Sequence, residues 1–437
     1  MLVRILQPYV ACLLASDLLL RLRRAKAELF RKVSQQPHEV SVFISLDDPY
    51  SFLLVQVLTN MQTRFDISIR FYLISHLQKE MFPDPEKWRK HSVIDACRLA
   101  AQHKLIAPSK DKLLSNEERA AFTSQILELH GTVNNTSDYL KILSKAWVKQ
   151  KVQERKLPQL DIVSVSQQLA ENEQKLKKMG HYLPASMHYG GEWYWGVDRL
   201  SHLEKRLNAL GLSKGINTVL YDTQELISKP VFTQSANKEE KQKSLEMFYS
   251  ARSPYSYLGL ERAAALCEKY HVNLVIKPVL PMVMRGMLVP HRKKMVIFHD
   301  TVREAKKYNI PYGFVADPLG KPIEHCYALF IHARHHGKEL AFLLNFGRAV
   351  NAEGRHADQL DTLKDIIERS GLDWEKARLE LENTTWREEL DQNYNELSSF
   401  GFWGVPCFKY GSEFTWGQDR LWFIEQLIQD DLVDPRN

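Results

Sequence analysis

Residues 248–258 read FYSARSPYSYL, and residues 43–53 read FISLDDPYSFL. Six of the eleven aligned positions carry the same residue, and the two stretches lie 205 residues apart, as from Pro49 to Pro254. In each stretch a short apolar run leads to a Ser or Asp followed by Pro, residues that favour the N-cap and first position of a helix. A strand, a tight turn and a helix are therefore predicted twice.

A second pair of matching sequences closes each copy. Residues 195–200 read WGVDRL and residues 416–421 read WGQDRL, which places them 221 residues apart. The two pairs occur in the same order along the chain, and the larger second offset leaves about 16 additional residues inside the second copy. A repeat of this size indicates a tandem duplication of one domain rather than a solenoid.

The pattern divides the 437 residues into four segments. Residues 1–37 are predicted to form an N-terminal amphipathic helix, 38–212 the first domain, 213–243 a linker and 244–432 the second domain. The linker assignment depends on the polar run 234–243, which lacks apolar periodicity.

The second copy predicts a mixed α/β domain. A strand over 274–278 would pair in parallel with the strand that ends at Tyr249, and residues 291–370 are rich in helix formers. Residues 405–410 and 413–416 read as a hairpin around Gly411 and Ser412, followed by a closing helix with an apolar stripe.

Composition excludes several classes of protein. There are 59 Lys and Arg against 53 Asp and Glu, a net charge of +6 that is too small for a dedicated nucleic-acid binder. The five cysteines are scattered and contain no CxxC pair, so neither a disulfide scaffold nor a CxxC disulfide oxidoreductase is expected. No metal-binding motif is found. A reducing compartment, the cytoplasm, is the expected location.

These motifs resemble the DsbA-like superfamily, which has a thioredoxin fold with a helical insertion. Within it they are most similar to the branch of 2-hydroxychromene-2-carboxylate isomerases and kappa-class glutathione transferases. The resemblance covers nearly all of the second copy and mainly the two ends of the first. It implies two tandem thioredoxin-like domains, with glutathione and a small aromatic or electrophilic substrate as the ligands.

Ser253 is the residue on which glutathione chemistry would depend. As an N-cap it would lie where unpaired amide groups carry about half a positive charge, a setting that lowers thiol pKa values. Its hydroxyl would donate to the glutathione sulfur and hold it as the thiolate. The alternative is that Ser253 only caps the helix, a role for which Ser is a preferred residue.

Other ligand contacts are implied by the resemblance alone. Val405 and Pro406 match the family's cis-proline segment, whose backbone pairs with a peptide-like ligand. Gln418 and Asp419 match the stretch that holds the γ-glutamyl end, although relatives typically carry Ser where Gln418 stands. Substrate or glutathione carboxylates would be anchored by Arg292 or Lys293. Each contact has a structural alternative. Pro406 could mark a bend at an edge strand, Asp419 could be an acid favoured at a helix start, and Arg292 with Lys293 could belong to a solvated basic patch.

The first copy is predicted to be degenerate. Asp48 stands where Ser253 stands in the second copy, and a carboxylate there would repel a thiolate. Leu183 and Pro184 are assigned as the counterparts of the proline segment, and Asp198 as the counterpart of Asp419. A structural or pairing role follows, in which the chain would carry both halves of an intramolecular pseudo-dimer.

Three functions remain open at this point. The first is a glutathione-dependent isomerase of the 2-hydroxychromene-2-carboxylate type. The second is a kappa-like glutathione transferase, and the third is a noncatalytic binding or scaffold protein. Consumption of glutathione separates the first two, and absence of glutathione binding would favour the third.

The N-terminal segment has two interpretations. Leu13, Leu14, Leu18 and Leu20 would lie on one side of a helix that runs to about Lys32. The favoured interpretation is that this side packs on the body of the protein. The alternative is a basic amphipathic helix in peripheral contact with an anionic membrane.

Overall fold

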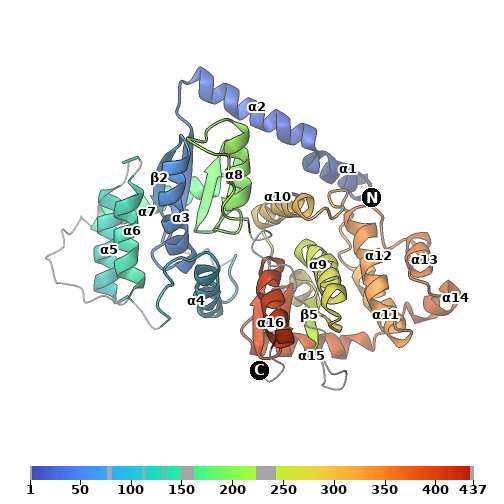
Figure 1. The fold of residues 1–437 in the computed structure, drawn as a ribbon. Coiled ribbons are helices and arrows are strands. Elements are labelled where there is room, and N and C mark those ends of the chain that lie inside the picture. The colour runs from blue at the N-terminus through green and yellow to red at the C-terminus, as the bar shows by residue number, and fades with distance from the viewer. Residues whose placement is uncertain are drawn as a thin grey trace. The chain divides into compact units, whose positions relative to one another are not determined.

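The chain folds into two compact units. The computed structural model describes residues 2–75, 81–110, 114–129, 132–133, 135–148, 162–222 and 243–433 (Figure 1). We call Arg21–Leu226 the N-terminal unit, and Met1–Leu20 together with Ile227–Asn437 the C-terminal unit. Most of the predicted linker 213–243 lies outside the described residues.

The N-terminal unit contains a four-stranded sheet in the order β2-β1-β3-β4. Strand β1 is parallel to β2 and antiparallel to β3, which forms a hairpin with β4. Its strands are β1 (Glu39–Ile44), β2 (Ser68–Leu73), β3 (Ser186–Tyr189) and β4 (Glu192–Trp195). Its helices are α3 (Pro49–Arg64), α4 (Pro85–Gln102), α5 (Asn116–Glu128), α6 (Thr136–Trp147), α7 (Ile162–Lys178) and α8 (Leu200–Ala209).

The C-terminal unit contains a second sheet with the same order and strand directions, β6-β5-β7-β8. Its strands are β5 (Leu245–Tyr249), β6 (Leu274–Pro278), β7 (Cys407–Tyr410) and β8 (Glu413–Trp416). Its helices are α9 (Pro254–Tyr270), η2 (Met282–Arg285), α10 (His291–Lys307), α11 (Lys321–His335), α12 (Glu339–Asn351), α13 (Leu360–Arg369), α14 (Trp374–Ala377), η3 (Arg378–Glu380), α15 (Trp386–Ser399), η4 (Gln418–Arg420) and α16 (Leu421–Val433).

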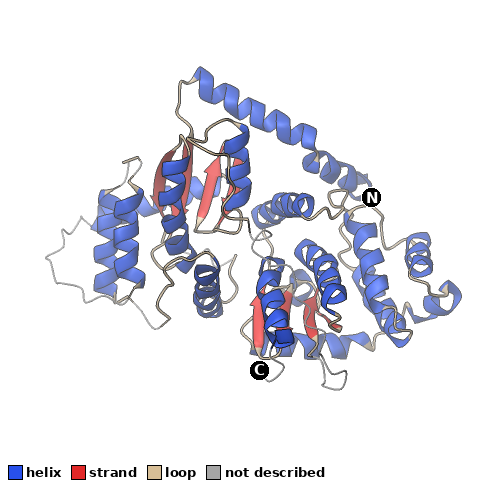
Figure 2. Ribbon diagram, in the orientation of Figure 1, coloured by secondary structure: helices blue, strands red, loops and turns tan. Residues whose placement is uncertain are grey.

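Helices are inserted at the same point of both units, between the parallel strand pair and the hairpin. Figure 2 shows helices beside the strands of each unit. In the C-terminal unit they cover a sheet that is buried on both faces. Met247 and Tyr249 belong to the large core with α9, α11 and α12, whereas Phe248 packs in a smaller core on the opposite face. This alternation follows from the period-two side-chain pattern of a strand.

The predicted hairpin is confirmed in its turn. Strands β7 and β8 are joined by Gly411 and Ser412, and Gly411 has a φ of 58°. Two-residue hairpin turns need positive φ, which glycine adopts without strain. The first strand begins at Cys407 rather than Val405, so the segment of Val405 and Pro406 stands outside the sheet.

The N-terminal segment departs from the single packed helix expected. Two helices, α1 (Leu2–Ala15) and α2 (Asp17–Val33), are separated at Ser16. Leu13 and Leu18 are exposed, and α2 buries none of its residues. Among the described residues, no helix by itself is long and apolar enough to cross a membrane, and α1 with α2 meets that criterion only as a pair bent by 52°.

Candidate active site

Ser253 lies at the junction between β5 and α9. Its backbone is extended (φ −79°, ψ 118°), and Pro254 occupies the first helical position behind it. The Ser253 Oγ accepts a hydrogen bond of 3.2 Å from the Ser256 amide, so the predicted N-cap is confirmed. One of the otherwise unpaired amides of the first turn is thereby satisfied.

The same hydroxyl reaches the segment before β7. Ser253 Oγ donates to the carbonyl oxygen of Val405 over 3.3 Å, and the Val405–Pro406 peptide bond is cis. Ser253 and Val405 are both half-buried. The structure therefore brings together three of the residues that the sequence singles out: Ser253, Val405 and Pro406.

Sheet topology explains why Ser253 lies next to Val405 and Pro406. Strands β5 and β7 are antiparallel with Phe248 opposite Cys407, so the carboxyl end of one lies beside the amino end of the other. Two glycines permit close packing around the proline. A Cβ on Gly259 would lie 3.3 Å from Pro406 Cγ, and a Cβ on Gly404 would lie 2.6 Å from Trp416 Cζ2.

Gln418 departs from its predicted role. Gln418 is fully buried. Its backbone carbonyl oxygen and its side-chain Oε1 both accept hydrogen bonds from the Arg262 guanidinium. Its amide nitrogen donates to Asp419 over 2.6 Å and to Glu304 over 3.3 Å. The predicted ligand contact of Gln418 would require breaking this internal network, so the side chain holds η4 in place instead.

Asp419 remains a candidate for a ligand ammonium. It is half-buried in η4, next to Gln418. The amide of Gly417 donates to the Pro406 carbonyl over 2.9 Å, which ties the start of η4 to the cis-proline. Asp419 thus follows a backbone position that is fixed relative to Pro406.

Two basic candidates lie in the first turns of α10. Arg292 and Lys293 are half-buried, and burial lowers the pKa of Lys293 to about 8. Asp300, seven residues after Lys293 and so on the same helix face, accepts a 2.6 Å hydrogen bond from the Tyr255 hydroxyl. Because Tyr255 lies in the first turn of α9, the Lys293 face of α10 is turned toward the helix that Ser253 caps.

Cys407 is a buried strand residue and not an exposed thiol. Its Sγ contacts the Gly404 carbonyl at 3.2 Å, and burial raises the thiol pKa well above its usual value. Within the part of the chain that the structure describes, no group of three His, Cys, Asp or Glu side chains could hold a metal ion.

The family model described as "DSBA-like thioredoxin domain" matches residues 244–429, all within the C-terminal unit. These residues form a DSBA-like thioredoxin domain.

Individual relatives are similar to this chain at low identity. Proteins named 2-hydroxychromene-2-carboxylate isomerase from Pseudomonas putida and Sphingobium xenophagum are 24% and 23% identical over 194 and 196 residues. These matches cover 42% and 43% of this chain, and 93% and 99% of the relatives. A solved structure of a 2-hydroxychromene-2-carboxylate isomerase is 22% identical to this chain, with a TM-score of 0.38. The match covers 43% of this chain and 94% of the solved chain. The matches to the two named relatives indicate that the DSBA-like domain has homology to 2-hydroxychromene-2-carboxylate isomerases.

The N-terminal unit places a carboxylate at the position that Ser253 holds in the DSBA-like domain. Asp48 caps α3, and its Oδ2 accepts from the Ser51 amide at 2.8 Å and from the Ser51 hydroxyl at 2.7 Å. Asp48 is only 5% exposed, and burial raises its pKa to about 6. It can accept hydrogen bonds where Ser253 can donate one.

The sequence assignment of the proline counterpart is wrong by one residue. In the sheets Phe43 is opposite Ser186 and Phe248 is opposite Cys407, so the residue equivalent to Pro406 is Ala185. The carbonyl of Ala185 accepts from the Gly196 amide at 2.7 Å, as that of Pro406 accepts from Gly417. Among the described residues, Val405–Pro406 is the one cis peptide bond, so the bond between Leu183 and Pro184 is trans.

The turn at Asp48 is also closed by aromatic rings. Tyr50 packs against Trp195 with centroids 5.0 Å apart and against Trp88 with centroids 6.2 Å apart. At the offset of 205 residues, Trp88 occupies the position of Lys293. Tyr50 is buried, whereas its equivalent Tyr255 in the DSBA-like domain is half-buried. Asp198, the equivalent of Asp419, is likewise half-buried.

Sequence reasoning missed one pair of residues that recurs in both units. Tyr50 donates to Asp95 over 2.8 Å, as Tyr255 donates to Asp300. Tyr50 and Tyr255 lie inside the two matched stretches, and Asp95 and Asp300 keep the same offset of 205, so extending the comparison beyond Leu53 would have found the two aspartates. Arg262, which fixes Gln418, gives no such signal because no motif contains it.

Proposed function

We propose that the DSBA-like domain is a glutathione-dependent isomerase of the 2-hydroxychromene-2-carboxylate type, in which Ser253 holds the glutathione sulfur as a thiolate. The observation that carries the proposal is the half-buried Ser253 hydroxyl, which caps α9 and lies 3.3 Å from the Val405 carbonyl beside the cis-proline. The names of the homologous proteins support the class of reaction.

The donors at this point fit a sulfur anion. The Ser253 proton is engaged in a long, neutral hydrogen bond to Val405. Turning the hydroxyl toward a thiolate would exchange that bond for a charge-assisted one, which is about twice as strong. The N-terminus of α9 adds a positive potential, because its amide groups point toward the same place.

The remaining contacts divide by charge. Glutathione carries two carboxylates and one ammonium. Lys293 and Arg292 would bind the carboxylates, and Asp419 would bind the ammonium. Gln418 would act indirectly by fixing the backbone of η4. When bound, glutathione supplies a sulfur nucleophile that adds reversibly to the unsaturated substrate. The chain itself binds that sulfur, keeps it ionised and orients it at the mouth of α9.

We infer further that the two units arose by tandem duplication and that the first has lost this chemistry. The support is the common strand order, the equivalent Tyr–Asp pairs and the equivalent amide bonds of Gly196 and Gly417. Asp48 and Ala185 replace the two groups on which thiolate binding would depend.

The test is turnover of 2-hydroxychromene-2-carboxylate in the presence of glutathione, followed by absorbance. Glutathione should be required and not consumed. Ser253→Ala removes a hydrogen bond to a charged group and should lower kcat/KM by roughly ten- to a hundredfold. Accumulation of a stable glutathione conjugate would assign a transferase, and lack of glutathione binding by calorimetry would assign a noncatalytic role.

Ser253→Asp is the matched control for folding. It reproduces the cap found naturally at Asp48 but gives up the hydrogen bond to Val405, so the chain should still fold cooperatively, with a somewhat lower Tm, while the ultraviolet absorbance of bound thiolate disappears. Thiolate absorbance that survives in Ser253→Asp and is lost in Asp48→Asn would move the assignment to the N-terminal unit.

A further inference from the structure

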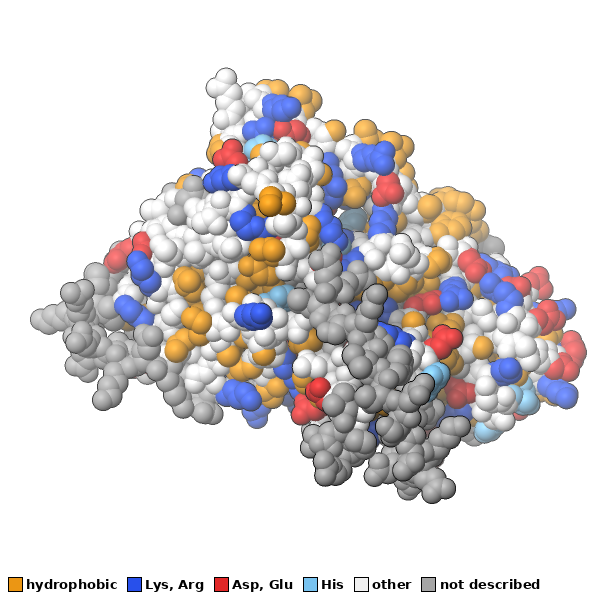
Figure 3. Space-filling view, viewed as in Figure 1, with side chains coloured by type: hydrophobic (Ala, Val, Ile, Leu, Met, Phe, Trp, Pro, Cys, Tyr) orange, Lys and Arg blue, Asp and Glu red, His pale blue; other side chains and the backbone are white. Residues whose placement is uncertain are grey.

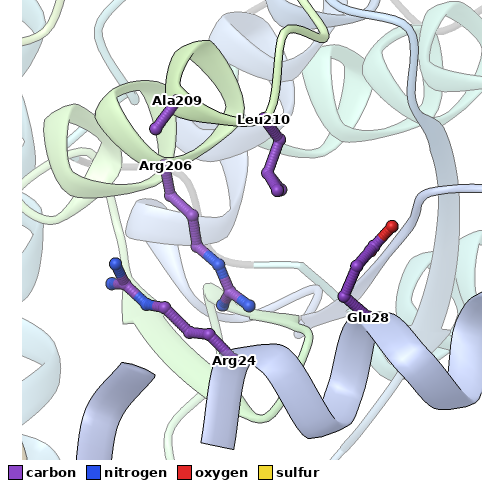
Figure 4. A pocket seen from close by; sticks show the side chains of 5 residues that line it. All are labelled: Arg24, Glu28, Arg206, Ala209 and Leu210. Carbon is purple, nitrogen blue, oxygen red and sulfur yellow. The ribbon is translucent and has the colours of Figure 1, made fainter. Parts of the chain in front are cut away.

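Helix α2 turns its charged side toward the N-terminal unit. Arg24 forms two hydrogen bonds of 2.7 and 3.0 Å with Glu192, and Arg206 of α8 meets the same carboxylate at 2.8 Å. Beneath the helix is a cavity of about 130 Å³, lined by Arg24, Glu28, Arg206, Ala209 and Leu210 (Figure 4). The body-facing side of α2 is therefore ionic, the reverse of what a helix packed on a core presents.

The opposite side of α2 is apolar and exposed. Leu22 is 57% exposed and Val33 is 75% exposed, and Leu29 and Phe30 lie between these values. At 100° per residue Leu22, Leu29 and Val33 fall within one narrow arc of the helix, with Ala25 beside them. A continuous apolar stripe facing outward marks an interaction site rather than scattered surface residues.

Basic side chains border this stripe. Arg21 and Lys32 lie on one edge and Lys26 on the other, and all three are exposed. Glu28, on the ionic side, is engaged with Arg31 at 2.6 Å. Over the place that α2 takes in Figure 1, the space-filling view shows apolar and basic side chains next to each other (Figure 3).

We propose that this face, defined by Arg21, Leu22, Lys26, Leu29, Phe30, Lys32 and Val33, docks into the surface of an anionic lipid bilayer. An apolar arc edged by cations matches the interface between headgroups and acyl chains, where the long basic side chains reach the phosphates. A second copy of the same face is a poorer partner, because it would bring two sets of cations together.

The test is co-flotation of the full chain with vesicles of phosphatidylcholine alone or mixed with phosphatidylserine. The full chain should float with the mixed vesicles and much less with neutral ones, and added salt should weaken the binding. Arg21→Gln, Lys26→Gln and Lys32→Gln together should weaken binding to the mixed vesicles roughly a hundredfold, at about fivefold per cation. Leu22→Ser with Leu29→Ser should weaken binding at least about tenfold.

Ile216→Ser is the matched control, because Ile216 is an 86% exposed apolar residue of the same unit outside α2. It should float like the parent chain. The proposal would be overturned if the parent chain failed to float with the mixed vesicles. It would also be overturned if the double variant Leu22→Ser with Leu29→Ser floated as well as the parent chain. A dimer in light scattering that this double variant abolishes, without vesicle binding, would assign the face to a second copy. None of these readouts depends on glutathione, so the proposal is separate from the proposed activity.

Discussion

At the scale of single residues, the two helix caps show how one substitution separates folding from chemistry. Asp48 and Ser253 both bind the amide three residues ahead, so both satisfy the first turn of the helix that follows. Ser253 keeps a proton that it can give to an anion, whereas Asp48 above its pKa has none. The cap conserves the local structure, and the identity of the capping group sets whether it can donate a hydrogen bond to an anion.

Burial of Asp48 predicts an unusual dependence of stability on pH. Its pKa rises from 3.8 to about 6 in the folded chain, so the folded state holds the proton more tightly than the unfolded one. This contribution to stability is complete below about pH 4 and is lost as the pH rises through about 6. Asp48→Asn has no carboxyl to ionise, so it should not lose this stability as the pH rises. Relative to the parent chain, its free energy of unfolding should therefore gain up to about 3 kcal/mol between about pH 4 and about pH 7. Chemical unfolding at both pH values measures the difference.

The matched control is Asp84→Asn, which changes the N-cap carboxylate of α4, a half-buried group in the same unit. Because Asp84→Asn leaves the buried Asp48 carboxyl in place, the loss of stability as the pH rises through about 6 should remain. A free-energy difference between Asp48→Asn and the parent chain that is the same near pH 4 and near pH 7 would contradict the assignment.

Lys293 predicts the pH dependence of ligand binding. Burial lowers its pKa to about 8, so the ammonium is present below that pH and is lost above it. If the cation holds a glutathione carboxylate, affinity should fall as the pH rises through about 8. Lys293→Arg keeps the charge throughout, so the affinity of the parent relative to the variant should decline above that pH. Calorimetric titrations across this range that give parallel profiles would exclude Lys293 from the site.

At the scale of elements, the hairpin β7–β8 fixes the cis-proline through Gly404. A methyl group at this position would lie 2.6 Å from Trp416 Cζ2, so either the indole or the Val405 segment has to move. Gly404→Ala should lower the free energy of unfolding by about 1–3 kcal/mol. It should also weaken glutathione binding, because Val405 carries the carbonyl that faces Ser253.

Gly215→Ala is the control for this prediction, since no atom lies within 4 Å of the Cβ that it adds. Denaturant unfolding and calorimetry on both variants provide the comparison. A Gly404→Ala chain as stable as Gly215→Ala, with unchanged glutathione affinity, would show that the close approach is not needed.

Some secondary-structure elements could be predicted from the sequence, and others could not. Strand, cap, helix and hairpin follow from local signals, so their existence was predictable from residues 248–258 and 405–416. The side on which α2 packs was not, because an amphipathic stripe does not say which face meets the protein. The partners of Gln418 were also beyond reach, since Arg262 and Glu304 come from other parts of the chain.

One error could have been avoided from the sequence alone. The offset of 221 between Trp195 and Trp416 aligns Pro406 with Ala185 and not with Pro184. The register of β3 and β7 enforces that offset, because a one-residue slip would turn every side chain of the strand to the opposite face.

At the scale of the whole molecule, two units with one architecture are expected to bind unequally. The DSBA-like domain offers the Ser253 hydroxyl, Pro406 and Lys293, and the N-terminal unit offers a buried carboxylate, Ala185 and Trp88 at the equivalent positions. Glutathione should therefore bind with a stoichiometry of one per chain in calorimetry. Ser253→Asp should remove that binding.

Introducing a hydroxyl in the N-terminal unit with Asp48→Ser tests whether the cap alone decides the difference in glutathione binding. No second molecule should bind, because Tyr50 stays packed between Trp88 and Trp195 and Ala185 still stands in place of the proline. The variant should instead be stabilised at neutral pH by the loss of a buried carboxylate. Two molecules bound to Asp48→Ser would show that the cap by itself governs binding, and two bound to the parent chain would show that both units are active.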